Sequence, residues 1–99
     1  MKIRILTSAL NDLADGRDFY KRQAAGVGDY FLDSLFSDID SLAFHAGVHR
    51  KVFGFHRLLS HRFPWAIYHR FDGAESVVVF RVLDCRQDPG KTVAALRSV

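Results

Sequence analysis

The side chains of this chain that could take part in chemistry are mainly arginines and histidines of its second half. They are Arg57, Arg62, Arg81, Arg86, His56 and His61. Guanidinium groups bind phosphates through two parallel hydrogen bonds, and an imidazole can carry a proton near neutral pH. An arginine cluster could therefore hold a phosphate beside a histidine. A histidine next to arginines in a strand is, however, more often a surface hydrogen-bonding group.

Three other residues have types that can bind metals or act as nucleophiles. His45 and His49 have the i, i+4 spacing that can place two ligands on one helix face. No carboxylate motif or cysteine accompanies them, and Gly47 interrupts the helix, so we expect no metal site and no cofactor. Cys85 has no histidine or lysine nearby in sequence and is interpreted as a small buried group.

The charge of the chain is unevenly distributed. Residues 1–49 carry 5 Lys and Arg against 7 Asp and Glu, whereas residues 50–99 carry 9 against 4. A basic half of a domain can attract nucleic acid or an acidic protein segment. The excess is small, so an ordinary solvated surface explains it equally well.

The length and composition indicate one domain over residues 1–99. The chain is 48% hydrophobic, which is ordinary for a protein with one core. No apolar run approaches the roughly 20 residues that cross a bilayer, and the alternating N-terminus, Met1 to Thr7, does not resemble a signal peptide. With a single cysteine, these features favour a protein of the reducing cytoplasm that has no membrane association.

The first half of the sequence predicts a strand followed by two helices. Alternation over residues 2–7 indicates the strand, and Thr7 or Ser8 is a suitable N-cap for a helix that continues to about Gln23. Asp12 is assigned to its exposed face. Residues 26–28 end this helix, and a second apolar stripe marks the next one. That stripe is Val27, Phe31, Leu35, Ile39 and Leu42.

Residues 51–84 change to strand-like patterning. Three stretches, 51–59, 62–71 and 75–84, are rich in aromatic and β-branched residues. Asp72-Gly73 between the last two is a strong hairpin signal. We therefore predict an α+β fold, with a helical hairpin on one face of a mostly antiparallel sheet of about four strands. The first strand is expected at the edge or beside the last strand.

The last predicted strand is apolar on both faces. One expected set is Val78, Phe80 and Val82. The opposite set is Val77, Val79 and Leu83, together with Arg81. One face must meet the helices, and the other stays uncovered unless residues 89–99 fold back or another molecule docks there. Asp88-Pro89 predicts the capped start of a short C-terminal helix.

Four blocks of the sequence carry a resemblance to a known family. They are Leu13–Tyr20 (LADGRDFY), Gly54–Leu59 (GFHRLL), Arg62–Tyr68 (RFPWAIY) and Val82–Pro89 (VLDCRQDP). In this order they resemble the plasmid-stabilisation proteins of the RelE/ParE superfamily. The resemblance implies a small cytoplasmic toxin, neutralised by a cognate antitoxin whose C-terminal segment wraps around it. A homodimer, or a heterotetramer with the antitoxin, is a possible assembly.

Members of this superfamily act in two ways. RelE-like toxins cut messenger RNA on the ribosome, whereas ParE-like toxins poison DNA gyrase by binding. In an RNase, Arg57, Arg81 and Arg86 would stabilise the phosphate, and His56 or His61 would move the proton. The chain lacks the aromatic residue or histidine that RelE-like enzymes place after the Arg-x-Asp-Pro region, so a ParE-like toxin is favoured. A relative that has lost toxicity is the third possibility.

The resemblance also implies an antitoxin-binding or target-binding surface on the open sheet face. The residues expected there are Arg57, Arg62, Val77, Val79, Arg81, Leu83 and Arg86. Arg57 and Arg86 recur in both functional types, which gives them an equally weighted structural alternative. In that alternative they pair with acidic groups such as Asp84 or Asp88 and fix the end of the sheet.

Overall fold

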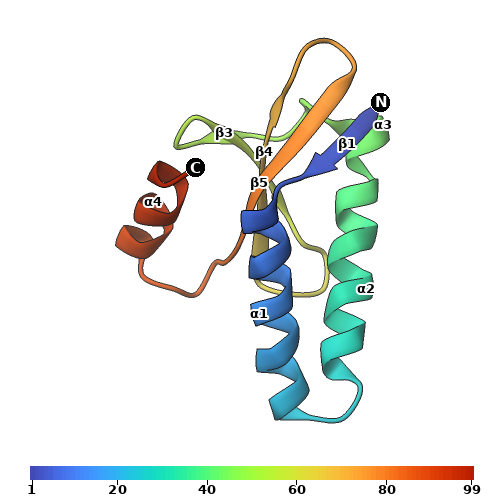
Figure 1. Ribbon diagram of the computed structural model, residues 1–99, viewed down its shortest axis with the longest axis vertical. Coiled ribbons are helices and arrows are strands. Elements are labelled where there is room, and N and C mark those ends of the chain that lie inside the picture. Colours follow the sequence, from blue (N-terminus) through green and yellow to red (C-terminus); the bar gives the residue numbers. More distant parts are fainter.

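The computed structural model describes residues 1–99 as a five-stranded sheet with helices on both faces (Figure 1). The elements are β1 (Lys2–Ile5), α1 (Thr7–Gln23), α2 (Val27–Asp40), α3 (Leu42–His45), β2 (Lys51–Val52), β3 (Phe55–Leu59), β4 (Trp65–Phe71), β5 (Ser76–Asp84) and α4 (Pro89–Arg97). The strand order is β1-β5-β4-β3-β2. Only the β1–β5 pair is parallel. No helix combines the length and the apolar character needed to cross a membrane.

The predicted α+β fold is confirmed, with one difference in the sheet. The stretch 51–59 forms two strands, β2 and β3, because Phe53 and Gly54 turn the chain back on itself with φ angles of 54° and 82°. The sheet therefore has five strands and not about four. β1 lies both at the edge and beside the last strand, as expected.

Helices α1 and α2 pack closely against each other and the sheet. The buried residues of α1 recur every three to four positions and form its inner stripe. They are Ala9, Leu13, Gly16 and Tyr20. A Cβ atom on Gly16 would lie 2.6 Å from the Phe31 ring and 3.0 Å from Trp65. Gly16 is thus required for this close approach.

The start of α1 differs from the prediction. The N-cap residue is Leu6, and no side chain caps the helix. The Ser8 hydroxyl instead donates to the carbonyl oxygen of Phe80, at 2.7 Å. The expected Thr7 or Ser8 cap is therefore wrong, because Ser8 is used in a contact with β5.

A β-bulge in β5 changes which residues face the helices. His69 pairs with Val79 and Tyr68 pairs with Arg81, so Phe80 is an extra residue without a partner in β4. Before the bulge the odd-numbered Val79 faces α1 and α2, and after it the even-numbered Val82 does. The predicted strict alternation of the two faces is therefore wrong.

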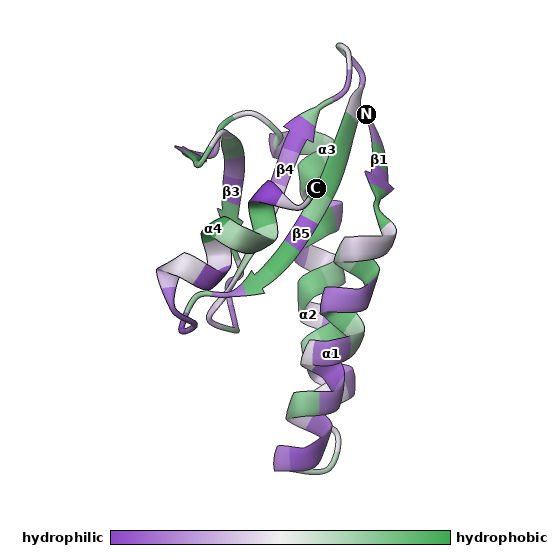
Figure 2. Ribbon diagram, turned by 60° about the vertical axis from the view of Figure 1, so that its left-hand side comes forward, coloured by the Kyte–Doolittle hydropathy of each residue, from purple (hydrophilic) through white to green (hydrophobic).

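The consequence is a second, smaller core on the other face. Helix α4 folds back there, with Leu96 buried against residues of three strands. Those residues are Phe55, Ala66, Tyr68 and Leu83. Asp88 caps α4 by accepting from the Gly90 amide at 2.9 Å, with Pro89 in the first turn, as predicted. Figure 2 shows β5 as hydrophobic along most of its length, as befits a strand covered on both faces.

Phe31 lies in the core between the sheet and helices α1 and α2, so we expect its truncation to reduce the stability of the fold strongly. This side chain is fully buried and contacts the rings of Tyr20, Phe63 and Trp65. Phe31→Ala should lower the free energy of unfolding by about 3–5 kcal/mol, through lost burial and a cavity. Urea denaturation followed by circular dichroism measures this.

The matched control is Phe44→Ala, because Phe44 is 86% exposed. Its effect should stay within about 0.5 kcal/mol of the parent. Equal effects of the two substitutions would show that the core of the hairpin has been wrongly assigned.

Candidate functional site

Arg81 forms an ion pair with Asp12 inside the fold. Its Nε and Nη2 atoms donate to the Asp12 carboxylate at 2.7 and 2.8 Å, and its Nη1 donates to the Ala95 carbonyl of α4 at 3.2 Å. The two side chains are only 19% and 11% exposed. Hydrogen bonding to Asp12 raises the pKa of Arg81 above its ordinary value. This arginine joins α1, β5 and α4 and has little surface left for a ligand.

Arg86 also has an acidic partner. It donates to both carboxylate oxygens of Asp84, at 3.0 and 2.8 Å, and to the hydroxyl of Tyr20 at 3.2 Å. Desolvation acts to raise the pKa of Asp84, but the hydrogen bonds from Arg86 outweigh it and the pKa lies below its usual value. The alternative that Arg86 pairs with Asp84 at the end of the sheet is confirmed.

Arg57 differs from these two arginines, because no ion pair involves it. It lies opposite Tyr68, which in turn lies opposite Arg81, so these three residues cross the face that carries α4. A cavity of about 230 Å³ lies beside Arg57 and Tyr68, and Cys85 and Gln87 also line it. Desolvation raises the pKa of Tyr68 despite the hydrogen bond and charge of Arg57.

Cys85 is exposed, so the prediction that it is buried is wrong. The β5 strand ends one residue earlier, at Asp84, and Cys85 begins the connection to α4, where its amide donates to the Pro64 carbonyl at 2.8 Å. Desolvation raises the pKa of its thiol, which Arg57 only partly offsets. The thiol is therefore protonated at neutral pH and is a poor nucleophile.

His56 and His61 lie differently relative to Arg57. His61 and Arg57 both line an open hollow of about 630 Å³. His61 has Nδ1 2.8 Å from the Asp38 carboxylate of α2, and its side chain is 76% exposed. His56 alternates with Arg57 along β3, stacks on His69 and has Nδ1 2.8 Å from the His49 carbonyl. The structure therefore brings only Arg57 and His61 of the predicted set to one hollow. Arg81 and Arg86 are paired with Asp12 and Asp84 instead.

The remaining predicted binding residues divide into exposed and buried ones. Arg62 is exposed, with its guanidinium carbon 6.0 Å from the centre of the Tyr30 ring. Val77 and Val79 are fully buried beneath the hairpin, and Leu83 is buried beneath α4. The expectation that these three share an open face with Arg81 is wrong, because of the bulge and because α4 covers the outer face.

Two contributing residues were missed by sequence reasoning. Asp12 was assigned to the exposed face of the first helix, although it accepts from Arg81 and from the Val82 amide at 3.0 Å. Its partner is 69 residues away, so no local pattern reveals it. Phe53 at the β2–β3 turn was read as part of a strand. The glycine that follows it was an available signal, since an isolated glycine in a strand pattern often marks a turn or bulge.

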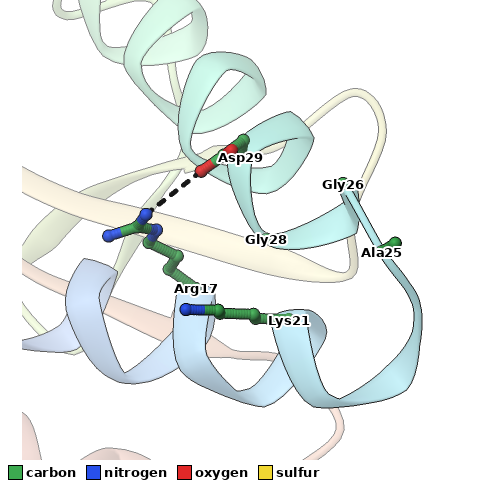
Figure 3. Close-up of a pocket in the computed structure, with 6 residues that line it drawn as sticks. All are labelled: Arg17, Lys21, Ala25, Gly26, Gly28 and Asp29. Carbon is green, nitrogen blue, oxygen red and sulfur yellow. Dashed lines mark ion pairs between the residues drawn. The ribbon is translucent and has the colours of Figure 1, made fainter.

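The turn between α1 and α2 forms a separate hollow of about 490 Å³ (Figure 3). Arg17 and Asp29 face each other across it, with 3.3 Å between Nη2 and Oδ1. A Cβ on Gly28 would lie 2.7 Å from the Arg17 carbonyl, which explains the glycine there. None of the predicted site residues lines this hollow, and of its charged residues Arg17 is paired with Asp29.

The fold is a small α+β domain with helices on both faces of a five-stranded sheet. The chain belongs to the family described as ParE toxin of type II toxin-antitoxin system, parDE, whose model matches residues 3–89. The resemblance to the RelE/ParE superfamily is thereby confirmed. Comparison with curated proteins gives no match.

A solved structure supports the fold independently. It is described as "Chromosomal ParDE TA system from P. aeruginosa" and is 18% identical to this chain, with a TM-score of 0.68. The match covers 83% of this chain and 92% of that chain. At this identity, the likeness concerns the fold alone.

The buried His69 predicts a loss of stability in acid. Its Nδ1 lies 3.2 Å from the Ile67 carbonyl, and its Nε2 has no partner. Burial, with smaller contributions from His49 and His56, lowers the pKa of His69 from 6.5 to about 4. Between about pH 6.5 and pH 4 the unfolded chain therefore binds more protons at His69 than the folded chain does. The free energy of unfolding is therefore unaffected by His69 above pH 6.5 and is lower by roughly 2 kcal/mol at pH 5.

The variant His69→Phe isolates this contribution, because it keeps a planar ring and removes the titrating group. Its free energy of unfolding, measured by urea denaturation from pH 7 to pH 5, should fall less steeply than that of the parent. The same slope in both proteins would show that His69 is not the group responsible.

Proposed function

We propose that this chain is a ParE-like toxin that is neutralised by a cognate antitoxin and inhibits growth by binding a cellular target. DNA gyrase is the first target to test. The observation that carries the proposal is that Arg81 and Arg86, two of the three arginines expected to hold a phosphate, are paired with Asp12 and Asp84. We place the protein in the cytoplasm, where this target resides.

An RNase mechanism needs several groups at one phosphate. Cleavage through the 2′-hydroxyl requires a base, an acid and cations that stabilise the phosphorane. Here Arg81 and Arg86 are paired with Asp12 and Asp84. Of the three arginines expected at the phosphate, only Arg57 has no acidic partner, and the one predicted histidine that shares a hollow with it is His61. These contacts favour action by binding over action by catalysis.

One observation supports the alternative, a RelE-like messenger endoribonuclease. Arg57 and Tyr68 line the same cavity, and a tyrosine can act as a general base beside a cation. Desolvation raises the pKa of Tyr68, however, which makes the reactive phenolate rarer at neutral pH. The alternative therefore ranks second.

The variant His61→Ala separates the two functions. We expect it to arrest growth as strongly as the parent, because the proposed toxin acts by binding and needs no proton carrier at His61, whose side chain is 76% exposed. Growth after induction, messenger integrity on purified ribosomes and gyrase supercoiling should be measured in parallel. His56→Ala is expected to behave in the same way once its soluble amount is matched.

The control for folding is the melting temperature of each variant. Ribosome-dependent messenger cleavage that disappears in His61→Ala or His56→Ala, with the fold intact, would overturn the proposal in favour of an RNase. Growth arrest with inhibited supercoiling and intact messenger would support it.

A further inference from the structure

We propose that the groove between the β2–β3 turn and α4 binds an acidic segment of the antitoxin that carries apolar side chains. The groove is formed by Phe53, Phe55, Arg57, Arg70, Leu96 and Arg97. The inference rests on the proposed function, because it names the surface at which the partner of that proposal docks.

Two cavities follow α4 along this groove. The first, of about 230 Å³, lies between Phe53 and the start of α4 at Pro89 and Thr92. The second, of about 390 Å³, lies between Phe53 and the later part of α4, at Val93 and Leu96. Phe53 lines both, so the two cavities form one groove along the length of the helix. The apolar residues that line the groove, such as Phe53, Val93 and Leu96, can contact apolar side chains of a docked protein segment.

Phe53 has a backbone conformation that is unfavourable for a phenylalanine. Its φ angle is 54°, in the left-handed region that Asn and Gly adopt readily and that is costly for a bulky side chain. Its side chain is nevertheless 56% exposed, so burial in this chain does not compensate the strain. An exposed, strained aromatic residue at the mouth of a groove is accounted for if a partner buries it.

The charge of the groove specifies the partner. Every charged residue that lines the two cavities is an arginine, namely Arg57, Arg70 or Arg97. None of them takes part in an ion pair. Aromatic and arginine side chains are also the residues that most often anchor protein interfaces. A segment with Asp or Glu beside apolar residues therefore complements the groove in both charge and polarity.

Arg70 explains why a protein segment fits better than a nucleic acid. Its guanidinium carbon lies 3.7 Å from the centre of the Phe55 ring, and its Nε donates to the Gly54 carbonyl at 3.0 Å. One face of this ring is thus already occupied and cannot stack on a base. The net charge of the chain, +3, is also small for a protein that binds a phosphate backbone.

The test measures binding of the full-length antitoxin encoded beside the toxin to the whole chain, by calorimetry. Phe53→Asn removes the aromatic ring and places a residue that favours the turn, so the variant should fold at least as stably as the parent. We expect its Kd to rise about tenfold or more, as for the loss of an interface anchor. Phe44→Asn, at an exposed aromatic residue outside the groove, should bind like the parent.

A second variant tests the charge. Arg57→Gln/Arg97→Gln should raise Kd and weaken its dependence on salt, whereas Arg22→Gln on α1 should do neither. Tight binding by the parent with unchanged affinity of Phe53→Asn would overturn the groove as the docking site. Failure of the parent to bind the antitoxin would instead contradict the proposed function. A labelled oligouridylate that binds the parent and is lost in Phe53→Asn would assign the groove to RNA.

Discussion

The arrangement of this protein depends on the Asp12 carboxylate of α1. Strand β1 pairs with β5 only up to Val79, so the remainder of that edge of β5 needs other partners. The Ser8 hydroxyl donates to the Phe80 carbonyl, and one turn later the Asp12 carboxylate accepts from the Val82 amide. The same carboxylate binds Arg81, which reaches the Ala95 carbonyl of α4. The Asp12 carboxylate therefore connects α1, β5 and α4. Removing either Asp12 or Arg81 alone would leave the other charge without its partner, which is costly at a site with little exposure to solvent.

This constraint also limits what the protein can do chemically. The bulge and the Asp12 contact fix Arg81 inside the fold, and Asp84 similarly occupies Arg86. Three arginines without acidic partners, Arg57, Arg70 and Arg97, line the groove beside α4, together with aromatic and aliphatic side chains. An apolar groove with free guanidinium groups is suited to binding a protein surface. This arrangement agrees with the proposal that the protein, a member of the ParE toxin family, acts by binding.

Much of the fold could be predicted from the sequence, because the relevant signals are local. The stripes of the two helices, the Asp72-Gly73 turn and the Asp88-Pro89 cap each depend on neighbouring residues. The site was harder to predict. A single extra residue in β5 reverses which face later side chains occupy, and β-propensity does not reveal it. The Asp12–Arg81 pair joins residues distant in sequence, and the covering of the outer face by α4 depends on tertiary packing.

The central claim is that Arg81 stabilises the fold and does not act directly in toxicity. The most direct measurement is growth arrest by the double variant Asp12→Asn/Arg81→Gln, which removes both charges and keeps side chains able to form hydrogen bonds. At matched soluble amounts, and with cooperative unfolding verified, the double variant should arrest growth as the parent does. A double variant that is folded and yet harmless would contradict the account, because it would show that the guanidinium of Arg81 acts directly in toxicity.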